Sequence, residues 1–386
     1  MLSVNFAGLK LRNPVIVASA TPSITADAIR KAEANGAGAV VTKSVMFPDA
    51  SGRPTGGNAK PRFQLYNTPN GYDPSLTKRG GQFSFFRMQE PYPTPEKMAK
   101  MLDELKGPGG VGIPVIVSIC GFTGDYASWR KLARLMEDAG ADAIELNGHA
   151  WDPIVKYSDP VIATVVKNEV KIPVIYKMMG VTEDPKSVAP QLAAAGADAI
   201  TGLGTFGLSA IELDVDNESP WFSSAHGLGG TWLRAVSLAF VAGIAQSVDI
   251  PVSGVTGIQC GDDAVKYMLL GATTVQVCAA IYAKGYKVLR EIADGIEAFM
   301  RRKGYSSLED FRGKALPKLT GAPPNDLPIR AVVNENCNGC GMCVESCMFD
   351  AIRCVDRETT ISEACEGCGV CWSFCPSKGI ELRNFA

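Results

Sequence analysis

A short apolar strand recurs eight times along the first part of the chain, up to about residue 300. Four copies follow a Gly-Ala turn and four follow a proline. The first kind covers residues 37–41, 139–144, 195–200 and 271–275, and the second covers 14–17, 114–117, 173–176 and 251–253. Helical stretches such as 129–139 and 185–195 separate them. Continuously apolar strands that alternate with helices are typical of a parallel sheet covered on both faces.

The number of units decides between the two common architectures of such a sheet. Eight strand–helix units in about 300 residues match the size of a (β/α)8 barrel, the TIM barrel. An open doubly wound sheet is the alternative, but no G-x-G-x-x-G follows the first strand. We therefore predict an α/β fold with a TIM barrel.

The residues directly after the strands mark the expected active site, because barrel enzymes place it at the carboxyl ends of their strands. Glycines are frequent after the seventh and eighth strands, where barrels commonly bind phosphate through backbone N–H groups. Lys43 and Lys177 end the second and fifth strands. They suit an anionic cofactor, although each lysine could equally extend to solvent or pair with a carboxylate.

Eight of the twelve cysteines lie in one C-terminal stretch that repeats the spacing C-x2-C-x2-C-x3-C. The two runs are Cys337, Cys340, Cys343 and Cys347, then Cys365, Cys368, Cys371 and Cys375. Bacterial two-cluster ferredoxins have this spacing and bind two [4Fe–4S] clusters, with each fourth cysteine serving the other cluster. Zinc sites use separated pairs of ligands, and disulfide frameworks belong to small secreted domains, so both alternatives fit poorly.

The likeness to ferredoxins implies how the cysteines divide between the clusters. Cluster one would take Cys337, Cys340, Cys343 and Cys375, and cluster two would take Cys365, Cys368, Cys371 and Cys347. Cys354 lies outside both runs and is expected to be a packed residue. We predict a barrel over residues 1–311, a Pro-rich linker over 312–330 and a ferredoxin-like domain over 331–386. The Gly-, Pro- and aromatic-rich stretch between Ser44 and Pro93 is expected to form a lid or a surface that faces the clusters.

Composition excludes several other classes of protein. The 386 residues include 38 basic and 40 acidic ones, and no Lys/Arg run suggests a nucleic-acid partner. No apolar run is long enough to span a membrane, and no signal peptide is recognised, so we expect a cytoplasmic protein.

Four segments of the barrel resemble the dihydroorotate/dihydropyrimidine dehydrogenase family: Lys43, 173–177, 252–258 and 269–277. With the cysteine runs, the likeness is strongest to the catalytic subunits of bacterial NAD-dependent dihydropyrimidine dehydrogenases, which join an FMN barrel to a two-cluster ferredoxin domain. The resemblance implies that FMN lies over the carboxyl ends of the strands. Its implied contacts are Ala18 and Ser19 at the ring, Lys43 and Lys177 at its polar edge, Gly254, Thr256, Gly257, Cys278 and Ala279 at the phosphate, and also Asn147 and Thr205.

The expected active-site loop departs from the family's pattern. Members usually carry Asn-x-Ser-Cys-Pro after the fourth strand, with the cysteine or a serine as the acid/base. Here Asn147 is kept, His149 follows two residues later, and Ala150 takes the place of the cysteine. Arg87 and Gln89 replace lid residues that contact pyrimidines in the family.

We therefore expect His149 to be the proton donor, with Arg87 or Asn147 stabilising enolate-like charge. His226 is read as an ordinary loop histidine, and a metal site made of the two histidines is disfavoured.

Together these features predict an FMN/iron–sulfur oxidoreductase acting on a carbonyl-activated C–C bond of a small molecule. Electrons would pass through the two [4Fe–4S] clusters to or from a partner. Because no dinucleotide fingerprint is present, the expected partner is an NAD(P)H-oxidising flavoprotein subunit or a ferredoxin, in a homo- or hetero-oligomer. Two alternatives stay open: a catalytic subunit that acts on pyrimidines, and an electron-transfer subunit without its own substrate.

Overall fold

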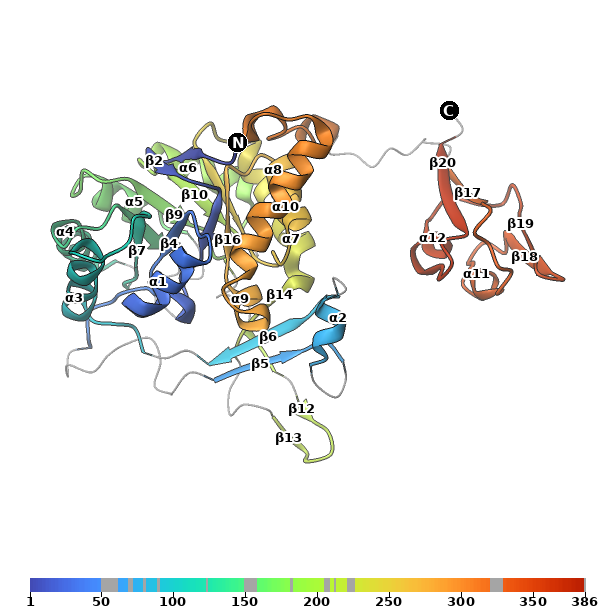
Figure 1. Ribbon diagram of the computed structural model, residues 1–386, viewed down its shortest axis with the longest axis horizontal. Coiled ribbons are helices and arrows are strands. Elements are labelled where there is room, and N and C mark those ends of the chain that lie inside the picture. Colours follow the sequence, from blue (N-terminus) through green and yellow to red (C-terminus); the bar gives the residue numbers. More distant parts are fainter. Residues whose placement is uncertain are drawn as a thin grey trace. The chain divides into compact units, whose positions relative to one another are not determined.

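The chain forms two compact units, Met1–Pro317 and Lys318–Ala386, in a computed structural model (Figure 1). The structure describes residues 1–49, 62–68, 72–78, 81–88, 91–122, 124–148, 158–180, 183–204, 209–211, 213–220, 226–319 and 329–384. The first unit extends beyond the boundary expected at residue 311. Gly313 and Ala315 donate backbone hydrogen bonds to Met268 and Leu269, both of 2.9 Å, so the expected linker begins too early.

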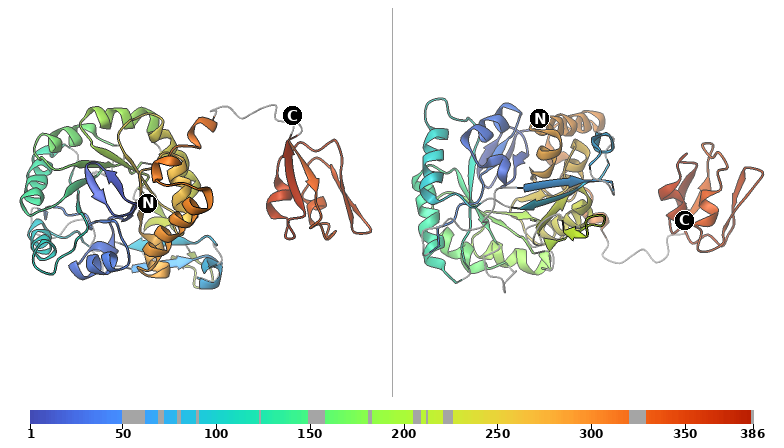
Figure 2. Two further views of the ribbon diagram at one scale, coloured as in Figure 1. Left: turned by 45° about the horizontal axis from the view of Figure 1, so that its top comes forward. Right: turned by 90° about the horizontal axis from the view of Figure 1, so that it is seen from below.

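Eight parallel strands close into a barrel, which confirms the predicted fold (Figure 2). In order around the barrel they are β3 (Val15–Val17), β4 (Ala39–Val41), β7 (Val115–Ile119), β8 (Ala143–Asn147), β9 (Val174–Lys177), β10 (Ala199–Gly202), β15 (Val252–Val255) and β16 (Thr274–Val277). The last strand pairs with the first, where Val275 lies opposite Val15. All eight strands are buried along their length, because side chains fill the barrel on one face and helices cover the other.

Helices follow the strands and form the outer layer of the barrel (Figure 2). They are α1 (Ala26–Ala34), α3 (Pro95–Lys106), α4 (Tyr126–Asp138), α5 (Pro160–Lys167), α6 (Pro185–Ala194), α7 (Arg234–Ala245), α8 (Gly261–Leu269), α9 (Ala279–Lys284) and α10 (Val288–Lys303). Phe6 and Leu11 of a small hairpin, β1 (Val4–Phe6) and β2 (Leu9–Leu11), pack against the buried side chains of six barrel strands. No helix in the described part of the chain is both long and apolar enough to cross a membrane.

Two insertions between barrel strands build a second sheet. Its order is β11 (Ser209–Ala210), β14 (His226–Gly230), β6 (Ser84–Met88) and β5 (Arg62–Tyr66), all antiparallel. The helix α2 (Pro74–Lys78) lies between β5 and β6 in the first insertion, and β12 (Leu213–Asp214) pairs with β13 (Ser219–Pro220) in the second. Thr231 joins the insertions, because its hydroxyl accepts a hydrogen bond of 2.8 Å from the Phe83 N–H. The stretch expected to be a lid is therefore partly a folded sheet.

The second unit is built from two similar halves. Its strands are β17 (Ile329–Val333) paired with β20 (Ile380–Asn384), and β18 (Ile352–Val355) paired with β19 (Glu358–Ile361). The short helices α11 (Met342–Glu345) and α12 (Val370–Phe374) begin inside the two cysteine runs. Each run holds two glycines with positive φ, Gly339 and Gly341 in the first and Gly367 and Gly369 in the second. The two cysteine runs therefore share one backbone conformation at these positions.

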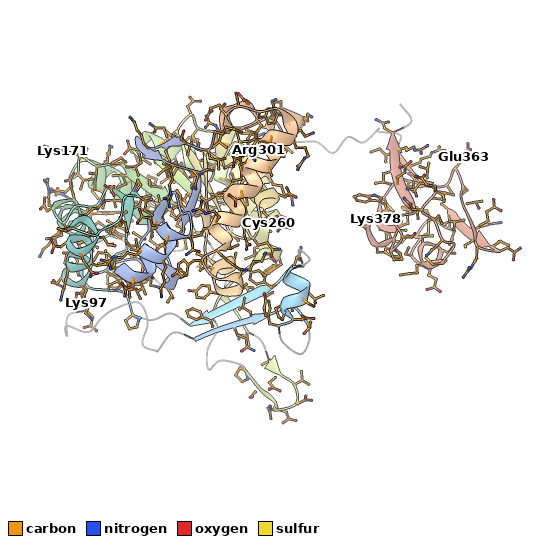
Figure 3. All side chains as sticks on the ribbon, in the orientation of Figure 1. Lys97, Lys171, Cys260, Arg301, Glu363 and Lys378 are labelled. Carbon is orange, nitrogen blue, oxygen red and sulfur yellow. The ribbon has the colours of Figure 1, made fainter. Side chains whose placement is uncertain are left out.

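Helices α8 and α10 approach unusually closely, and Cys260, the residue before α8, is labelled beside this contact in Figure 3. A Cβ atom on Gly261 would lie 2.5 Å from the Cα of Gly295, and one on Gly295 would lie 2.8 Å from the Cα of Gly261. Both distances are shorter than side chains tolerate, so the contact requires glycine on each helix.

A Gly295→Ala variant tests this contact. Alanine normally favours a helix interior by roughly 1 kcal/mol over glycine, but here its methyl group would push α8 and α10 apart, for which overpacking costs of roughly 1–3 kcal/mol are typical. We expect a net loss of stability in urea unfolding followed by circular dichroism. Asp294→Ala, at an exposed neighbouring position, is the control. A Gly295→Ala protein as stable as the wild type would contradict the close packing.

Candidate functional site

One cavity opens where the strands of the barrel end. It encloses about 890 Å³, including its solvent-open part, which is within the usual range for small-molecule sites. Nine of the predicted site residues line it: Ala18, Ser19, Lys43, Asn147, Lys177, Thr256, Gly257, Cys278 and Ala279. Residues of six barrel strands and of the loops after them thus meet around one space.

The other expected site residues are not among the described residues that line this cavity. Gly254 does not line it, because a Cβ there would lie 2.4 Å from the ring of Tyr267, which packs against the glycine. Arg87 and His226 lie in β6 and β14, but their side chains are outside the described part of the structure. His149 and Thr205 fall outside the described residues altogether.

Several lining residues were not among the predicted ones. Ser44 and Gln276 lie at strand ends beside predicted residues, and this position of their polar side chains was an available signal. Phe83, Tyr92 and Gly229 to Thr231 come from the two insertions, or from the residues that adjoin α3. Their position at the cavity depends on pairing between segments that are distant in sequence, and no local sequence pattern predicts such pairing.

A buried polar network lies under the cavity at Lys177. The Nζ atom of Lys177 donates to Gln276 Oε1 at 3.1 Å and lies 3.4 Å from Glu145 Oε1. Gln276 Nε2 donates to the other carboxylate oxygen at 2.6 Å. The hydroxyl of Thr201 donates to that oxygen as well, at 3.2 Å. Lys177 is therefore held on the cavity floor as part of a buried ion pair with Glu145, so its side chain does not extend to solvent.

Lys43 is the second lysine at the cavity and is only 4% exposed. Its Nζ atom lies 5.0 Å from the ring centroid of Tyr92, a cation–π contact. Burial raises the pKa of the nearby Cys120 thiol to about 12, although the positive charge of Lys43 acts in the opposite direction. Cys120 is thus a neutral thiol at physiological pH and offers no thiolate to a reaction.

A chain of hydroxyl groups leads to Asn147. Its Nδ2 atom donates to Ser44 Oγ at 3.0 Å, and Ser44 Oγ lies 2.9 Å from Ser118 Oγ and 3.3 Å from Ser19 Oγ. Among the described residues, the buried Oδ1 atom of Asn147 has no hydrogen-bond partner. An unpaired buried acceptor is costly, so this atom is suited to accept a hydrogen bond from a bound ligand.

The turn after β15 is shaped by its own side-chain contacts. Thr256 has φ of 87°, unfavourable for a β-branched residue, and its hydroxyl donates to Leu203 O at 2.8 Å. Tyr267 Oη donates to Thr256 O at 2.6 Å. Gly257, with φ of 77°, lies against Arg234, whose Cβ would be 2.7 Å from a Cβ at position 257. Backbone rather than side chain therefore faces the cavity at Gly257.

The cavity wall between β9 and β10 is apolar. Met179 and Gly204 both line it, and the Met179 sulfur lies 2.0 Å from where a Cβ of residue 204 would be. The thioether occupies the volume that a larger side chain at position 204 would need. This part of the wall offers a ligand contact with apolar atoms rather than a strong hydrogen-bond partner.

Two smaller cavities lie in the second unit, and each is lined by four cysteines. Cys337, Cys340, Cys343 and Cys375 line one cavity of about 290 Å³, and Cys347, Cys365, Cys368 and Cys371 line the other, of about 330 Å³. No group of His, Cys, Asp or Glu in the described ranges is arranged to hold a single metal ion. The four sulfurs thus surround a space in each case rather than one point.

Comparison with known proteins gives the same picture of the barrel. The model of the dihydroorotate dehydrogenase family matches residues 1–300. Dihydroorotate dehydrogenase B (NAD(+)), catalytic subunit, of Pyrococcus abyssi is 32% identical over 82% of this chain and 99% of its own length. The corresponding subunit of Thermococcus kodakarensis is also 32% identical, over 82% of this chain and 98% of its own.

A further relative extends the match beyond the barrel. The NAD-dependent dihydropyrimidine dehydrogenase subunit PreA of Escherichia coli is 29% identical over 90% of this chain and 85% of its own length. Ninety per cent of the chain is more than the first unit alone, so this match includes part of the cysteine-containing unit. The chain therefore belongs to the dihydroorotate dehydrogenase family and is a flavin oxidoreductase that acts on CH–CH groups.

Proposed function

We propose that the chain binds FMN in the strand-end cavity and two [4Fe–4S] clusters in the second unit, and passes electrons between a small-molecule substrate and a protein partner. The observation that carries the proposal is the convergence of nine predicted cofactor residues on one cavity in a chain with two four-cysteine cavities. Bound FMN exchanges electrons in pairs with a substrate and singly with iron–sulfur clusters.

The residues of the cavity fit FMN. Lys43 and Lys177 supply positive charge for the polar edge of the ring, and Asn147 Oδ1 is an unused acceptor for a ring N–H. The backbone at Thr256 and Gly257, together with the start of α9, lies where barrels commonly hold a phosphate. Phe83 and Tyr92 line the cavity with aromatic rings from segments outside the barrel strands, and would limit the access of water.

The substrate we propose is a small molecule with a carbonyl-activated C–C bond, and not a standard pyrimidine. The apolar wall of Met179 and Gly204 supports this, because a site for pyrimidines needs partners for the N–H and C=O groups of the ring. His149 is proposed as the proton donor, and Arg87 or Asn147 as the group that stabilises negative charge on the substrate oxygen.

The electron relay rests on the second unit. We propose one cluster on Cys337, Cys340, Cys343 and Cys375, and the other on Cys365, Cys368, Cys371 and Cys347. The relatives are named as subunits of NAD-dependent enzymes. A flavoprotein subunit that oxidises NAD(P)H, or a ferredoxin, is therefore the proposed partner, in the cytoplasm.

The cofactor proposal is tested by a pair of glycine variants. Gly257 and Gly124 both have positive φ, so alanine strains the backbone at each by roughly 1–3 kcal/mol. An added methyl group meets Arg234 at position 257 and nothing within 4 Å at position 124. We expect Gly257→Ala to bind FMN at least about tenfold more weakly, or about 1.4 kcal/mol, whereas Gly124→Ala retains it. Chromatography of the cofactor released from wild-type protein should identify FMN, and any other compound would refute the proposal.

The clusters are tested by removing one proposed ligand and one cysteine outside both sets. Wild-type protein purified without oxygen should hold about eight iron and eight sulfide ions per chain. Cys340→Ala should lose about half of each, because one cluster loses a ligand. Cys354→Ala should lose none, since Cys354 lines neither four-cysteine cavity. Zinc in place of iron, or equal loss in both variants, would rule out the proposed ligand sets.

The substrate class is tested by anaerobic titration of the reduced protein. We expect an α,β-unsaturated carboxylate or thioester to reoxidise the flavin, and pyrimidines to react far more slowly. His149→Gln should lower turnover by roughly 10²–10⁴-fold, the usual contribution of a general acid. A protein that none of these compounds oxidises would instead be an electron-transfer subunit, and full turnover by the variant would exclude His149 as the acid.

A further inference from the structure

Glu145 is a carboxylate enclosed within the barrel. It lies in the middle of β8 and is 0% exposed. Three described side chains contact it, namely Lys177, Thr201 and Gln276. Lys177 and Gln276 line the large cavity, whereas Glu145 and Thr201 do not. Glu145 therefore reaches the cavity through the side chains of its partners.

Stability does not explain a charge at this position. Removing a carboxylate from water is expensive, and apolar residues can often replace a buried ion pair without loss of stability. Buried apolar residues also lie close by in the barrel, namely Ala143 on the same strand and Ile116 and Ile175 on the two neighbouring strands. An apolar residue of similar size would suit β8 as a structural element. The carboxylate is better explained by what it does to Lys177 and Gln276.

The contacts define two effects on the cavity floor. First, Glu145 Oε1 lies 3.4 Å from Lys177 Nζ and offsets its positive charge. Second, Glu145 Oε2 accepts a hydrogen bond from Gln276 Nε2, which turns Gln276 Oε1 towards Lys177. The lysine is thereby fixed between two oxygens. Its charge, as felt by a ligand in the cavity, is reduced by the carboxylate beneath it.

We propose that Glu145 is a positioning residue that holds Lys177 and, by offsetting its charge, sets the reduction potential of FMN bound in the cavity. This inference rests on the proposed FMN site. Reduced FMN carries more negative charge than oxidised FMN, so positive charge nearby favours the reduced form. By offsetting the charge of Lys177, Glu145 limits the stabilisation of reduced FMN. Reduced FMN can therefore still pass its electrons to the clusters.

The test compares the two-electron reduction potential of FMN in full-length variants, by anaerobic titration against a reference dye with the cluster absorbance subtracted. In Glu145→Gln, Lys177 loses its counter-charge. We expect reduced FMN to gain at least about tenfold in affinity relative to oxidised FMN, which corresponds to a rise of about 30 mV. In Thr201→Val, which removes a neutral partner of Glu145, the potential should stay unchanged.

A double-mutant cycle shows whether Glu145 acts through Lys177. Lys177→Met alone should lower the potential. Adding Glu145→Gln to this variant should then change the ratio of the affinities for reduced and oxidised FMN by less than about twofold. If Glu145→Gln does not fold alone, Glu145→Asp keeps the charge but withdraws it from Lys177, and a smaller rise is expected. The double variant removes both charges together and avoids an unpaired buried lysine.

The outcomes separate this inference from the proposed function. Wild-type protein without FMN would overturn both. FMN bound in every variant, with the same potential in wild type and in Glu145→Gln or Glu145→Asp, would overturn only the role of Glu145. A rise that persists in full when Lys177 is methionine would show that Glu145 acts on the flavin without Lys177, and would also overturn the inference.

Discussion

A closed parallel barrel brings the carboxyl ends of all its strands to one rim, and the site of this protein depends on that constraint. Lys43, Asn147 and Lys177 are far apart in sequence and meet only because β4, β8 and β9 end on the same side. The hydrogen bonds between neighbouring strands fix the positions of these residues along the barrel axis. Asn147, for example, lies opposite Lys177 in the register of β8 and β9. The polar network of the cavity floor is thus a product of strand register.

The predictable part of this structure is the part with a local pattern. The eight strands followed from apolar runs with Gly-Ala or Pro starts, and each lies within a few residues of its expected position. Lys43 and Lys177 were expected at the cavity because they end strands. The repeated cysteine spacing likewise anticipated the grouping of cysteines around two cavities.

The features that were not predicted depend on the direction in which a side chain points and on contacts between segments that are distant in sequence. Gly254 belongs to the right strand, but it faces Tyr267 rather than the cavity. Phe83 and Thr231 meet across 148 residues, and no short-range signal connects them. Glu145 is a polar residue of β8 whose three partners, Lys177, Thr201 and Gln276, come from other strands, so its role cannot be inferred from its own segment. Register and the direction of each side chain, rather than the identity of the elements, therefore limit what can be inferred from this sequence.

The pairing of β16 with β3 has a consequence for the order of biosynthesis. Val15 emerges from the ribosome 260 residues before its partner Val275. Contacts of such long sequence separation form slowly, because the entropy of closing a long loop is lost before the contacts can stabilise the fold. The nascent barrel consequently exposes an open edge at β3 until β16 is made. The cavity is complete only after β16 is made, shortly before the cysteine runs follow.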